Sequence, residues 1–425
     1  MNGRLKGVKR VSIAIIVPLL VCCCGTSPKS PSQAASSAVN ASETGGTGAE
    51  TGGTAVATVA GSSSSVTYDR HITFLYPEKG TVFSYNSELS ITLQNTKGFP
   101  LDSVHFFIDN RRVSPTVSLN VPPTASPPTV SHYTLKTPSQ KVGNVTLKVV
   151  AFHGNDSTPA NSPANSPVPI QASIDTRTIT VKPDTPPVRH SYEVVNKFPH
   201  DRKAFTQGLV CHQGYLYEST GEYGRSGIRK IDRSDWKVVS MLSIDNHLFG
   251  EGITIYKDKI VQLTWTSRKG FVYDLGTFSL ESTFTYNTQG WGITTIGDEL
   301  IMSDGTNKLY RLDPRSFSVT SQIEVWDDRG AVDQLNELEL IDGLVWANVW
   351  QTDRIVMIDP VSGAIKGDLD MSGLLSVSER SHINEREDVL NGIAVNVTSG
   401  TVYVTGKNWP SLFEINVAND AAYRK

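Results

Sequence analysis

Five short segments of similar sequence recur along the second half of this 425-residue chain. They read TQGLV, GEGIT, GWGIT, LNELE and LNGIA, and their third residues are 44, 40, 45 and 55 positions apart. An apolar pair followed by an acid or an amide recurs later in each repeat, at Asp232, Asp274, Asp313, Asp359 and Asn416. Repeats of about 40 residues with four short strands each are typical of β-propellers. The spacing therefore predicts a five-bladed β-propeller over residues 191–425.

The two ends of this repeat region predict how the ring closes. The fifth repeat ends after FEINV and lacks a fourth strand, whereas an alternating segment, Ser191 to Phe198, precedes the first repeat. We expect this segment to supply the missing strand, because a closed ring leaves no open sheet edge. A polar insertion from Ser372 to Asp388 accounts for the long spacing of 55 positions between the last two repeats.

Residues 67–184 contain six or seven short alternating runs separated by turn residues, with IDNRR as the expected turn of a hairpin. This pattern predicts an immunoglobulin-like β-sandwich, joined to the propeller by a Pro-rich linker over residues 185–190. The whole chain is thus expected to be all-β. No cluster of titratable residues is apparent in the sandwich sequence, which favours a role in spacing or docking.

The N-terminus has the layout of an export signal. Basic residues precede the apolar run from Val11 to Val21, which ends in Cys22, Cys23 and Cys24. This end resembles the lipobox of bacterial lipoproteins, so residues 1–24 are expected to be a signal peptide with Cys23 as the lipid attachment site. The alternative is an ordinary secretory signal that is removed with its cysteines. Residues 25–66 are rich in Ser, Thr, Ala and Gly and are predicted to be a disordered tether.

These features predict an exported, lipid-anchored protein that faces the periplasm or the cell exterior. The net charge of -3 and the pI of about 6.3 give no basic footprint, which argues against nucleic acid as a partner. No His pair or Cys cluster has the spacing of zinc ligands, and no G-x-S-x-G nucleophile motif is present. We therefore predict no metal ligands.

Two independent counts along the repeats bring polar and aromatic side chains to one opening. The start of the first strand and the end of the second strand of each sheet lie at the same mouth of a propeller. One count takes the residue just before each repeat position. The other takes the residue nine positions before each third-strand acid or amide. Together they provide the first group of candidates. These are Gln207, Glu251, Trp265, Trp291, Asn336, Trp350, Asn391 and Lys407. The first repeat breaks the second count, and Glu218 is one candidate for its counterpart; Asp304 is interpreted as a turn residue.

With Phe205 and Phe249 added as aromatic walls, the chain resembles the glutamine cyclotransferases of plants and bacteria. The words that carry the resemblance run from Tyr192 to Val417 and include FTQGL, FGEGIT, LTW, GWGIT, LNELE, DVLNGIA and GKNWP. The resemblance implies a five-bladed propeller, in agreement with the repeat count. It also implies a set of channel residues, all present in this sequence: Phe205, Gln207, Phe249, Glu251, Trp265, Trp291, Asn336, Trp350 and Lys407.

The reaction implied by the resemblance converts the N-terminal glutamine of a peptide or protein into pyroglutamate and releases ammonia. A carboxylate such as Glu251 suits the proton transfers of this reaction, and Lys407 and Asn336 are the expected donors to the oxyanion. Phe205, Gln207, Phe249 and the three tryptophans are expected to bind the substrate. No cofactor is expected to be required, although the resemblance leaves open a calcium ion in the channel.

Two other functions fit parts of the sequence. A calcium-dependent lactonase or esterase on a related propeller would need several carboxylates around one ion, and this mouth offers one strong carboxylate and a lysine. A non-catalytic propeller that binds peptide N-termini would use the same aromatic walls. Release of ammonia from a Gln-initiated peptide separates these alternatives from the cyclotransferase.

Overall fold

The computed structural model describes residues 56–57, 66–98, 100–119, 128–137, 141–153 and 170–418. Within these residues the chain is all-β, as predicted, with one short helix, α1 (Val377–Arg380). The predicted signal peptide, its Cys23 and most of the predicted tether lie outside the described residues. None of the helices in the described part of the chain has the length and apolarity needed to cross a bilayer.

Residues 66–182 form two mainly antiparallel sheets. One has the strand order β1-β2-β11-β10-β6-β7, with β4 also paired to β11, and the other has the order β3-β5-β9-β8. The strands of the first sheet are β1 (Val56–Ala57), β2 (Val66–Asp69), β4 (Val82–Ser84), β6 (Ser103–Ile108), β7 (Arg111–Val113), β10 (Gly143–His153) and β11 (Ile170–Lys182). Those of the second are β3 (Ile72–Tyr76), β5 (Glu88–Asn95), β8 (Val117–Leu119) and β9 (Thr129–Lys136).

Alternation along these strands builds one apolar core shared by the two sheets. In β5 every second residue is buried, and its Leu89 and Ile91 pack in the same cluster as Phe106 of β6 and Leu147 of β10. The predicted hairpin turn lies between β6 and β7, where Asp109 and Asn110 have φ values of 45° and 65°. Two consecutive left-handed residues are what a tight hairpin turn requires.

From residue 188 onward the chain forms five sheets of four strands, one of which carries a fifth strand. The first sheet is β14 (Thr206–His212), β15 (Tyr215–Thr220), β16 (Gly227–Asp232) and β17 (Lys237–Ser243). The second is β18 (Gly250–Tyr256), β19 (Lys259–Thr264), β20 (Lys269–Asp274) and β21 (Leu280–Thr285). The third is β22 (Ile293–Ile296), β23 (Glu299–Ser303), β24 (Lys308–Leu312) and β25 (Val319–Glu324). The fourth is β26 (Leu335–Ile341), β27 (Leu344–Val349), β28 (Arg354–Ile358), β29 (Ile365–Asp370) and β12 (Val188–His190). The fifth is β30 (Leu390–Val395), β31 (Val402–Gly406), β32 (Ser411–Val417) and β13 (Tyr192–Pro199).

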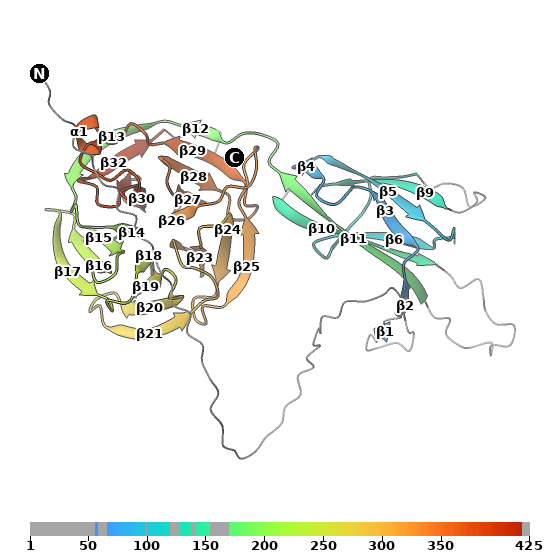
Figure 1. Cartoon of the computed structure of the whole chain (residues 1–425), viewed down its shortest axis with the longest axis horizontal. Coiled ribbons are helices and arrows are strands. Elements are labelled where there is room, and N and C mark those ends of the chain that lie inside the picture. Colours follow the sequence, from blue (N-terminus) through green and yellow to red (C-terminus); the bar gives the residue numbers. More distant parts are fainter. Residues whose placement is uncertain are drawn as a thin grey trace, which may run out of the picture. The chain divides into compact units, whose positions relative to one another are not determined.

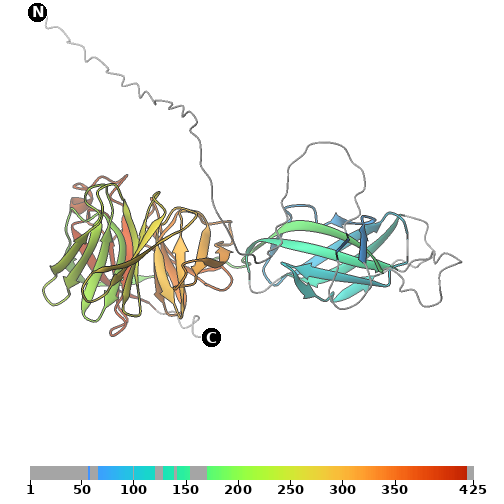
Figure 2. The same ribbon diagram turned by 90° about the horizontal axis from the view of Figure 1, so that it is seen from below.

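The first strands of these sheets contact one another in a closed cycle, β14 to β18, β22, β26, β30 and back to β14. Figure 1 shows the sheets around a central axis with β17, β21 and β25 on the outside, and Figure 2 shows the same ring from the side. β13 pairs antiparallel with β32, from Tyr192 opposite Val417 to Pro199 opposite Ser411. The predicted pairing between the segment before the first repeat and the last strand is thus confirmed.

The repeat glycines allow the first strands to approach closely near the axis. A Cβ on Gly252 would lie 2.6 Å from the carbonyl oxygen of Trp291, and one on Gly292 would lie 2.0 Å from that of Asn336. Real Cβ atoms do not come this close, so any larger residue would separate neighbouring sheets. In the fourth repeat Glu337 replaces the glycine, and its carboxylate accepts hydrogen bonds from the backbone of Leu209 and Ile393.

The described part of residues 66–182 contains ten strands, β2 to β11, rather than the predicted six or seven, and two further strands lie in the segments predicted to be tether and linker. β1 falls inside the predicted tether and pairs with β2, and β12 falls inside the predicted linker and pairs in parallel with β29. Both segments are only two or three residues long, so their composition carries little signal. Backbone hydrogen bonds to a neighbouring strand, which composition does not reveal, make them regular.

Candidate functional site

β-bulges place the polar side chains of the first strands. In four sheets the first strand shifts register against the second strand of the same sheet. The shift lies near the start of the first strand, which is β14, β18, β26 or β30. The residues left without a direct partner include Gln207, Glu251, Asn336 and Asn391. A bulge turns a side chain out of the regular alternation, and bulges therefore often occur beside active sites. Here they release one polar side chain from each of four sheets.

A single pocket of about 200 Å³ collects the predicted residues. Its lining contains all nine of the predicted catalytic and substrate-binding residues and two further ones from the segment before β30. The lining residues are Phe205, Gln207, Phe249, Glu251, Trp265, Trp291, Asn336, Trp350, Arg386, Glu387 and Lys407. Five of these residues are aromatic and six are polar or charged, so the pocket combines apolar walls with convergent polar groups, as small-ligand sites do.

The pocket holds a buried acid and a buried cation. Glu251 and Lys407 are each only 4% exposed. Burial raises the pKa of Glu251 well above its usual range, although the charge of Lys407 opposes this shift. Burial also lowers the pKa of Lys407 to about 8, and the charge of Glu251 opposes that shift. Burial thus shifts the pKa of the acid upward and the pKa of the cation downward, as is common for groups that transfer protons or stabilise charge in active sites.

Hydrogen bonds across three sheets orient the acid. Gln207 Nε2 donates to Glu251 Oε1 over 3.1 Å, and Asn391 Nδ2 donates to Gln207 Oε1 over 3.3 Å. Asn391 also donates to the carbonyl of Thr206, so it fixes the bulge that carries Gln207. Asn391 is absent from the pocket lining and acts on the site through Gln207.

The aromatic side chains form a connected wall. Phe205 and Phe249 meet edge to face at a centroid distance of 6.0 Å, and Phe249 meets Trp265 at 5.6 Å. Trp291 and Trp350 meet at 5.6 Å with an interplanar angle of 83°. Lys407 Nζ lies 4.8 Å from the centroid of the Phe205 ring. Such edge-to-face contacts hold the rings in fixed orientations around the polar groups.

Gln289 links the two halves of this wall and was missed by the sequence prediction. Its Oε1 accepts hydrogen bonds from the indole nitrogens of both Trp265, at 2.7 Å, and Trp291, at 3.0 Å. Gln289 precedes the inner strand by several residues and lies outside both repeat counts, so spacing alone gave no signal for it.

Arg386 and Glu387 also line the pocket without having been predicted. Both belong to the polar insertion from Ser372 to Asp388, which precedes the start of β30. Because the starts of the first strands face the pocket, the position of the insertion was the signal that could have found them. The backbone carbonyl of Arg386 accepts a hydrogen bond from Gln351 Nε2 over 3.0 Å, which ties the insertion to the residue after Trp350.

Two other candidates have structural roles. Glu218 is buried outside the pocket lining, where it bonds His200 Nε2 at 2.9 Å and Thr206 Oγ1 at 2.7 Å, so its candidacy for the site is wrong. Its proposed position failed because the first repeat breaks the count. Asp304 is a turn residue as predicted: its Oδ1 accepts from the backbone and hydroxyl of Thr306, and Gly305 has a φ of +83°.

The pocket does not suit a calcium ion. Calcium takes six to eight oxygen ligands, usually with several carboxylates. Glu251 is the one deeply buried carboxylate of this lining, and the ammonium of Lys407 shares the pocket with it. The carboxylate of Glu337 is already bonded to two backbone amides. The donor set therefore disfavours calcium and, with it, the calcium-dependent hydrolase.

Comparison with known proteins gives a consistent picture for the ring of sheets. Residues 169–417 match the family model described as glutamine cyclotransferase. A glutaminyl-peptide cyclotransferase of Arabidopsis thaliana is 43% identical over 236 residues, which cover 54% of this chain and 72% of that protein. The crystal structure of Myxococcus xanthus glutaminyl cyclase is similar with a TM-score of 0.51 and 35% identity, over 54% of this chain and 98% of that one. The chain therefore belongs to the glutamine cyclotransferase family.

Proposed function

We propose that this chain is a glutaminyl-peptide cyclotransferase, an acyltransferase that converts the N-terminal glutamine of peptides or proteins into pyroglutamate and releases ammonia. The observation that carries the proposal is the presence of a buried acid and a buried cation, Glu251 and Lys407, within one aromatic pocket. Membership in the family supports the reaction, and the chemistry of the pocket supports the roles of individual residues.

In the proposed mechanism Glu251 moves one proton. After the bound α-ammonium has lost one proton to solvent, the lone pair of the neutral amine attacks the side-chain amide carbon while the carboxylate of Glu251 takes a second proton from the same nitrogen. A new C–N bond forms while the amide C=O becomes an oxyanion. The carboxylic acid of Glu251 then returns the proton to the leaving nitrogen, the second C–N bond breaks, and ammonia departs. General acid–base catalysis of this kind is typically worth ~10²–10⁴-fold.

The other polar groups act on charge and position. Lys407 and the side-chain amide of Asn336 stabilise the oxyanion, and loss of one such donor costs on the order of 10²–10³ in kcat. Gln207 holds the carboxylate of Glu251 in place. The aromatic residues Phe205, Phe249, Trp265, Trp291 and Trp350 bind the substrate's ammonium, exclude water and fold the glutamine side chain toward its own amine. No step of this mechanism uses a cofactor.

The rest of the chain is given the following roles. The five sheets are the blades of a five-bladed β-propeller, and residues 67–184 are an immunoglobulin-like sandwich. Residues 1–24 are an export signal that ends in a lipid anchor on Cys23, so the enzyme acts at the membrane surface, facing the periplasm or the cell exterior. The apolar run and the cysteines that end it support the anchor. Growth of cells that make this protein with a radioactive or clickable fatty acid tests whether the protein becomes lipidated.

The proposed activity is tested by coupled detection of ammonia from a Gln-initiated peptide. We expect stoichiometric ammonia and a product that is 17 Da lighter, the mass of the ammonia lost, whereas the same peptide starting with Asn gives neither. Binding of the Gln peptide without turnover would support the non-catalytic binding propeller instead. Retained turnover in Glu251→Gln would remove Glu251 from the mechanism.

A further inference from the structure

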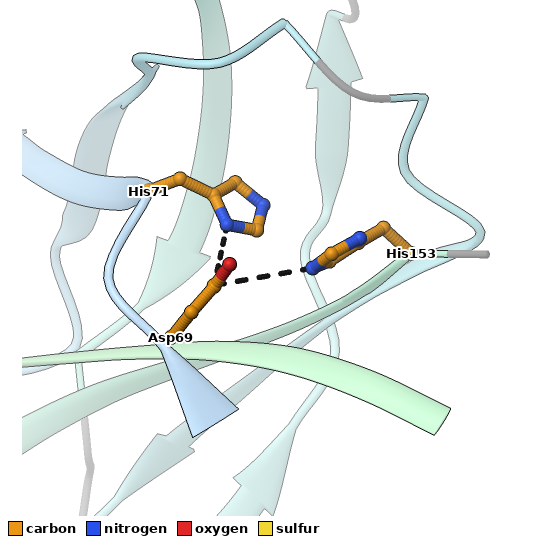
Figure 3. A group of neighbouring side chains, drawn as sticks. All are labelled: Asp69, His71 and His153. Atoms are coloured by element: carbon orange, nitrogen blue, oxygen red, sulfur yellow. Dashed lines mark hydrogen bonds and ion pairs between the residues drawn. The ribbon is translucent and has the colours of Figure 1, made fainter. Parts of the chain in front are cut away.

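A second cluster of chemically active side chains lies in the two-sheet region, far along the sequence from the cyclase pocket. Asp69 ends β2, His71 directly precedes β3, and His153 ends β10. Asp69 Oδ1 lies 2.5 Å from His71 Nδ1 and 3.9 Å from His153 Nε2. Figure 3 shows both imidazole rings facing the carboxylate of Asp69. The ligand atoms of all three residues lie within 4.8 Å of one another.

The surroundings fix these side chains in place. The side chains of His71 and His153 are 0% and 1% exposed, whereas that of Asp69 is 32% exposed and gives access from solvent. The two rings meet edge to face, with centroids 4.3 Å apart. Ser173 Oγ accepts hydrogen bonds from the backbone amides of both His71 and Ile72, which anchors the chain beside the cluster to β11.

We propose that Asp69, His71 and His153 bind one divalent transition-metal ion of the zinc, copper or cobalt class. Two imidazole nitrogens and one carboxylate oxygen are donors that these ions accept, whereas calcium and magnesium prefer all-oxygen sites. In a tetrahedral site with bonds of about 2.0–2.2 Å, neighbouring donors lie roughly 3.4 Å apart. The two distances from Asp69 Oδ1, 2.5 and 3.9 Å, lie on either side of this value, so the donors are spaced on the scale that a shared ion requires.

Proton balance is simple at this site. In the metal-free cluster a proton lies between Asp69 and His71 Nδ1. The ion takes its place: the lone pair of Nδ1 binds the metal, and the displaced proton leaves to solvent or moves to Nε2 of the same ring. Lys97 contacts the other carboxylate oxygen, Oδ2, at 3.3 Å and leaves Oδ1 toward the histidines.

The prediction of no metal ligands overlooked this cluster because its residues are far apart in the sequence. His71 and His153 are 82 positions apart and follow no zinc-ligand spacing. Pairing of β2 with β11 and of β11 with β10 brings the ends of β2 and β10 to the same edge of the sheet. The site is independent of the cyclase pocket, because none of its ligands lines that pocket.

The test uses the full chain, stripped with a chelator and titrated with Zn²⁺, Cu²⁺ and Co²⁺ separately. We expect one tight equivalent of Zn²⁺ by calorimetry. Asp69→Asn and His153→Asn should each weaken binding by more than about tenfold, because each removes a direct ligand, and loss of a group that only supports a ligand already costs about 10–100-fold. His132→Asn is the matched control, because His132 lies exposed on β9 of the same region. Its affinity should equal that of the unaltered chain.

Spectroscopy of the unaltered chain decides the question even if the variants fail to fold. Bound Cu²⁺ should show hyperfine coupling to two imidazole nitrogens, and bound Co²⁺ should lack the intense thiolate band that cysteine ligation produces. Ammonia release by the stripped and zinc-loaded protein should be equal, which separates this site from the proposed function. Binding that is equally tight in both variants, a thiolate spectrum, or no copper signal with two nitrogens would overturn the proposal.

Discussion

The side-chain amide of Gln207, on β14, donates a 3.1 Å hydrogen bond to the carboxylate of Glu251, on the neighbouring β18. Both residues lie in bulges near the start of their strands. The contact therefore joins two sheets at the pocket and fixes the acid without neutralising it. A substitution that keeps this hydrogen bond can therefore test the proton transfer by Glu251 separately from its contact with Gln207.

Glu251→Gln should abolish turnover while the protein keeps its fold. The amide oxygen of the new glutamine can still accept the hydrogen bond from Gln207, whereas the amide cannot carry the proton. Because the substitution is nearly isosteric and keeps the hydrogen bond from Gln207, the melting temperature should stay nearly unchanged. Ammonia release measures the loss of turnover, and thermal unfolding of the same protein measures the melting temperature. A large drop in melting temperature would mean that the lost activity reports unfolding.

The pH dependence of kcat/KM should be bell-shaped. The active form needs Glu251 deprotonated and Lys407 protonated, so activity rises as Glu251 loses its proton and falls as Lys407 loses its own. The acidic limb should lie above the ordinary carboxyl range, because burial raises the pKa of Glu251, and the alkaline limb should lie near 8. Profiles with one Gln-initiated peptide, corrected for ionisation of its own amine, measure both limbs.

Lys407→Met should move the acidic limb to higher pH and reduce the rate by roughly 10²–10³-fold. The charge of Lys407 lowers the pKa of Glu251 in the native pocket, so its removal lets burial raise that pKa further. Lys203→Met serves as the control, because Lys203 is exposed just before the pocket residue Phe205. An unchanged acidic limb in Lys407→Met would show that another group sets it.

Gln289→Met should raise KM for Gln-initiated peptides with a smaller effect on kcat. The substitution leaves the indole nitrogens of Trp265 and Trp291 without their shared acceptor, so the substrate-binding wall loses its fixed orientation. Steady-state kinetics measure the split between the two constants. Gln322→Met, at an exposed position on β25, should leave both constants unchanged. A fall in kcat with constant KM would instead place Gln289 in the chemical step.

The His200–Glu218 pair should contribute to stability in a defined pH window. Burial opposes the charge on each group, but mutual attraction and hydrogen bonds outweigh it, so the pKa of His200 is raised above 6.5 and that of Glu218 is lowered below 4.5. The contribution of His200 is fully present below 6.5 and is lost as the pH rises through its raised pKa. That of Glu218 is present above 4.5 and is lost as the pH falls through its lowered pKa.

Glu218→Gln should therefore reduce the free energy of unfolding most between about pH 4.5 and 6.5, by about 3–5 kcal/mol for loss of one partner of a buried pair. Urea titrations across this range measure the difference, and Glu193→Gln, at an exposed site on β13, provides the comparison. A loss that does not vary with pH would mean that packing rather than charge accounts for the effect.

A shortened chain that begins at Asp184 should fold and cyclise with unchanged kcat/KM. Every residue of the pocket lining lies between Phe205 and Lys407, and a start at Asp184 retains both β12 and β13. A start at Arg189 would cut into β12 and should lower the melting temperature. Ammonia release and circular dichroism of the two shortened chains test this. Loss of activity in the longer one would show that the preceding region contributes to the site.

The repeat pattern was sufficient to predict the strands of the five sheets other than β12, and seven of the eleven residues that line the pocket. Glu251 and Lys407 could be found because equivalent positions in successive sheets face one axis, so equal spacing in sequence becomes proximity in space. Gln289 could not, because it lies in a connecting segment outside both repeat counts. Glu218 shows the same limit, since an irregular turn in the first repeat shifted the count onto a structural residue.

The pairing of β13 with β32 has a consequence for biosynthesis. The partners Tyr192 and Val417 are separated by 225 positions, so this sheet cannot be completed until almost the whole chain has been made. Contacts over such long separations form late, and until then β13 has no partner strand. A chain still held on the ribosome therefore cannot complete this sheet, and the ring closes only after its last strand has been released.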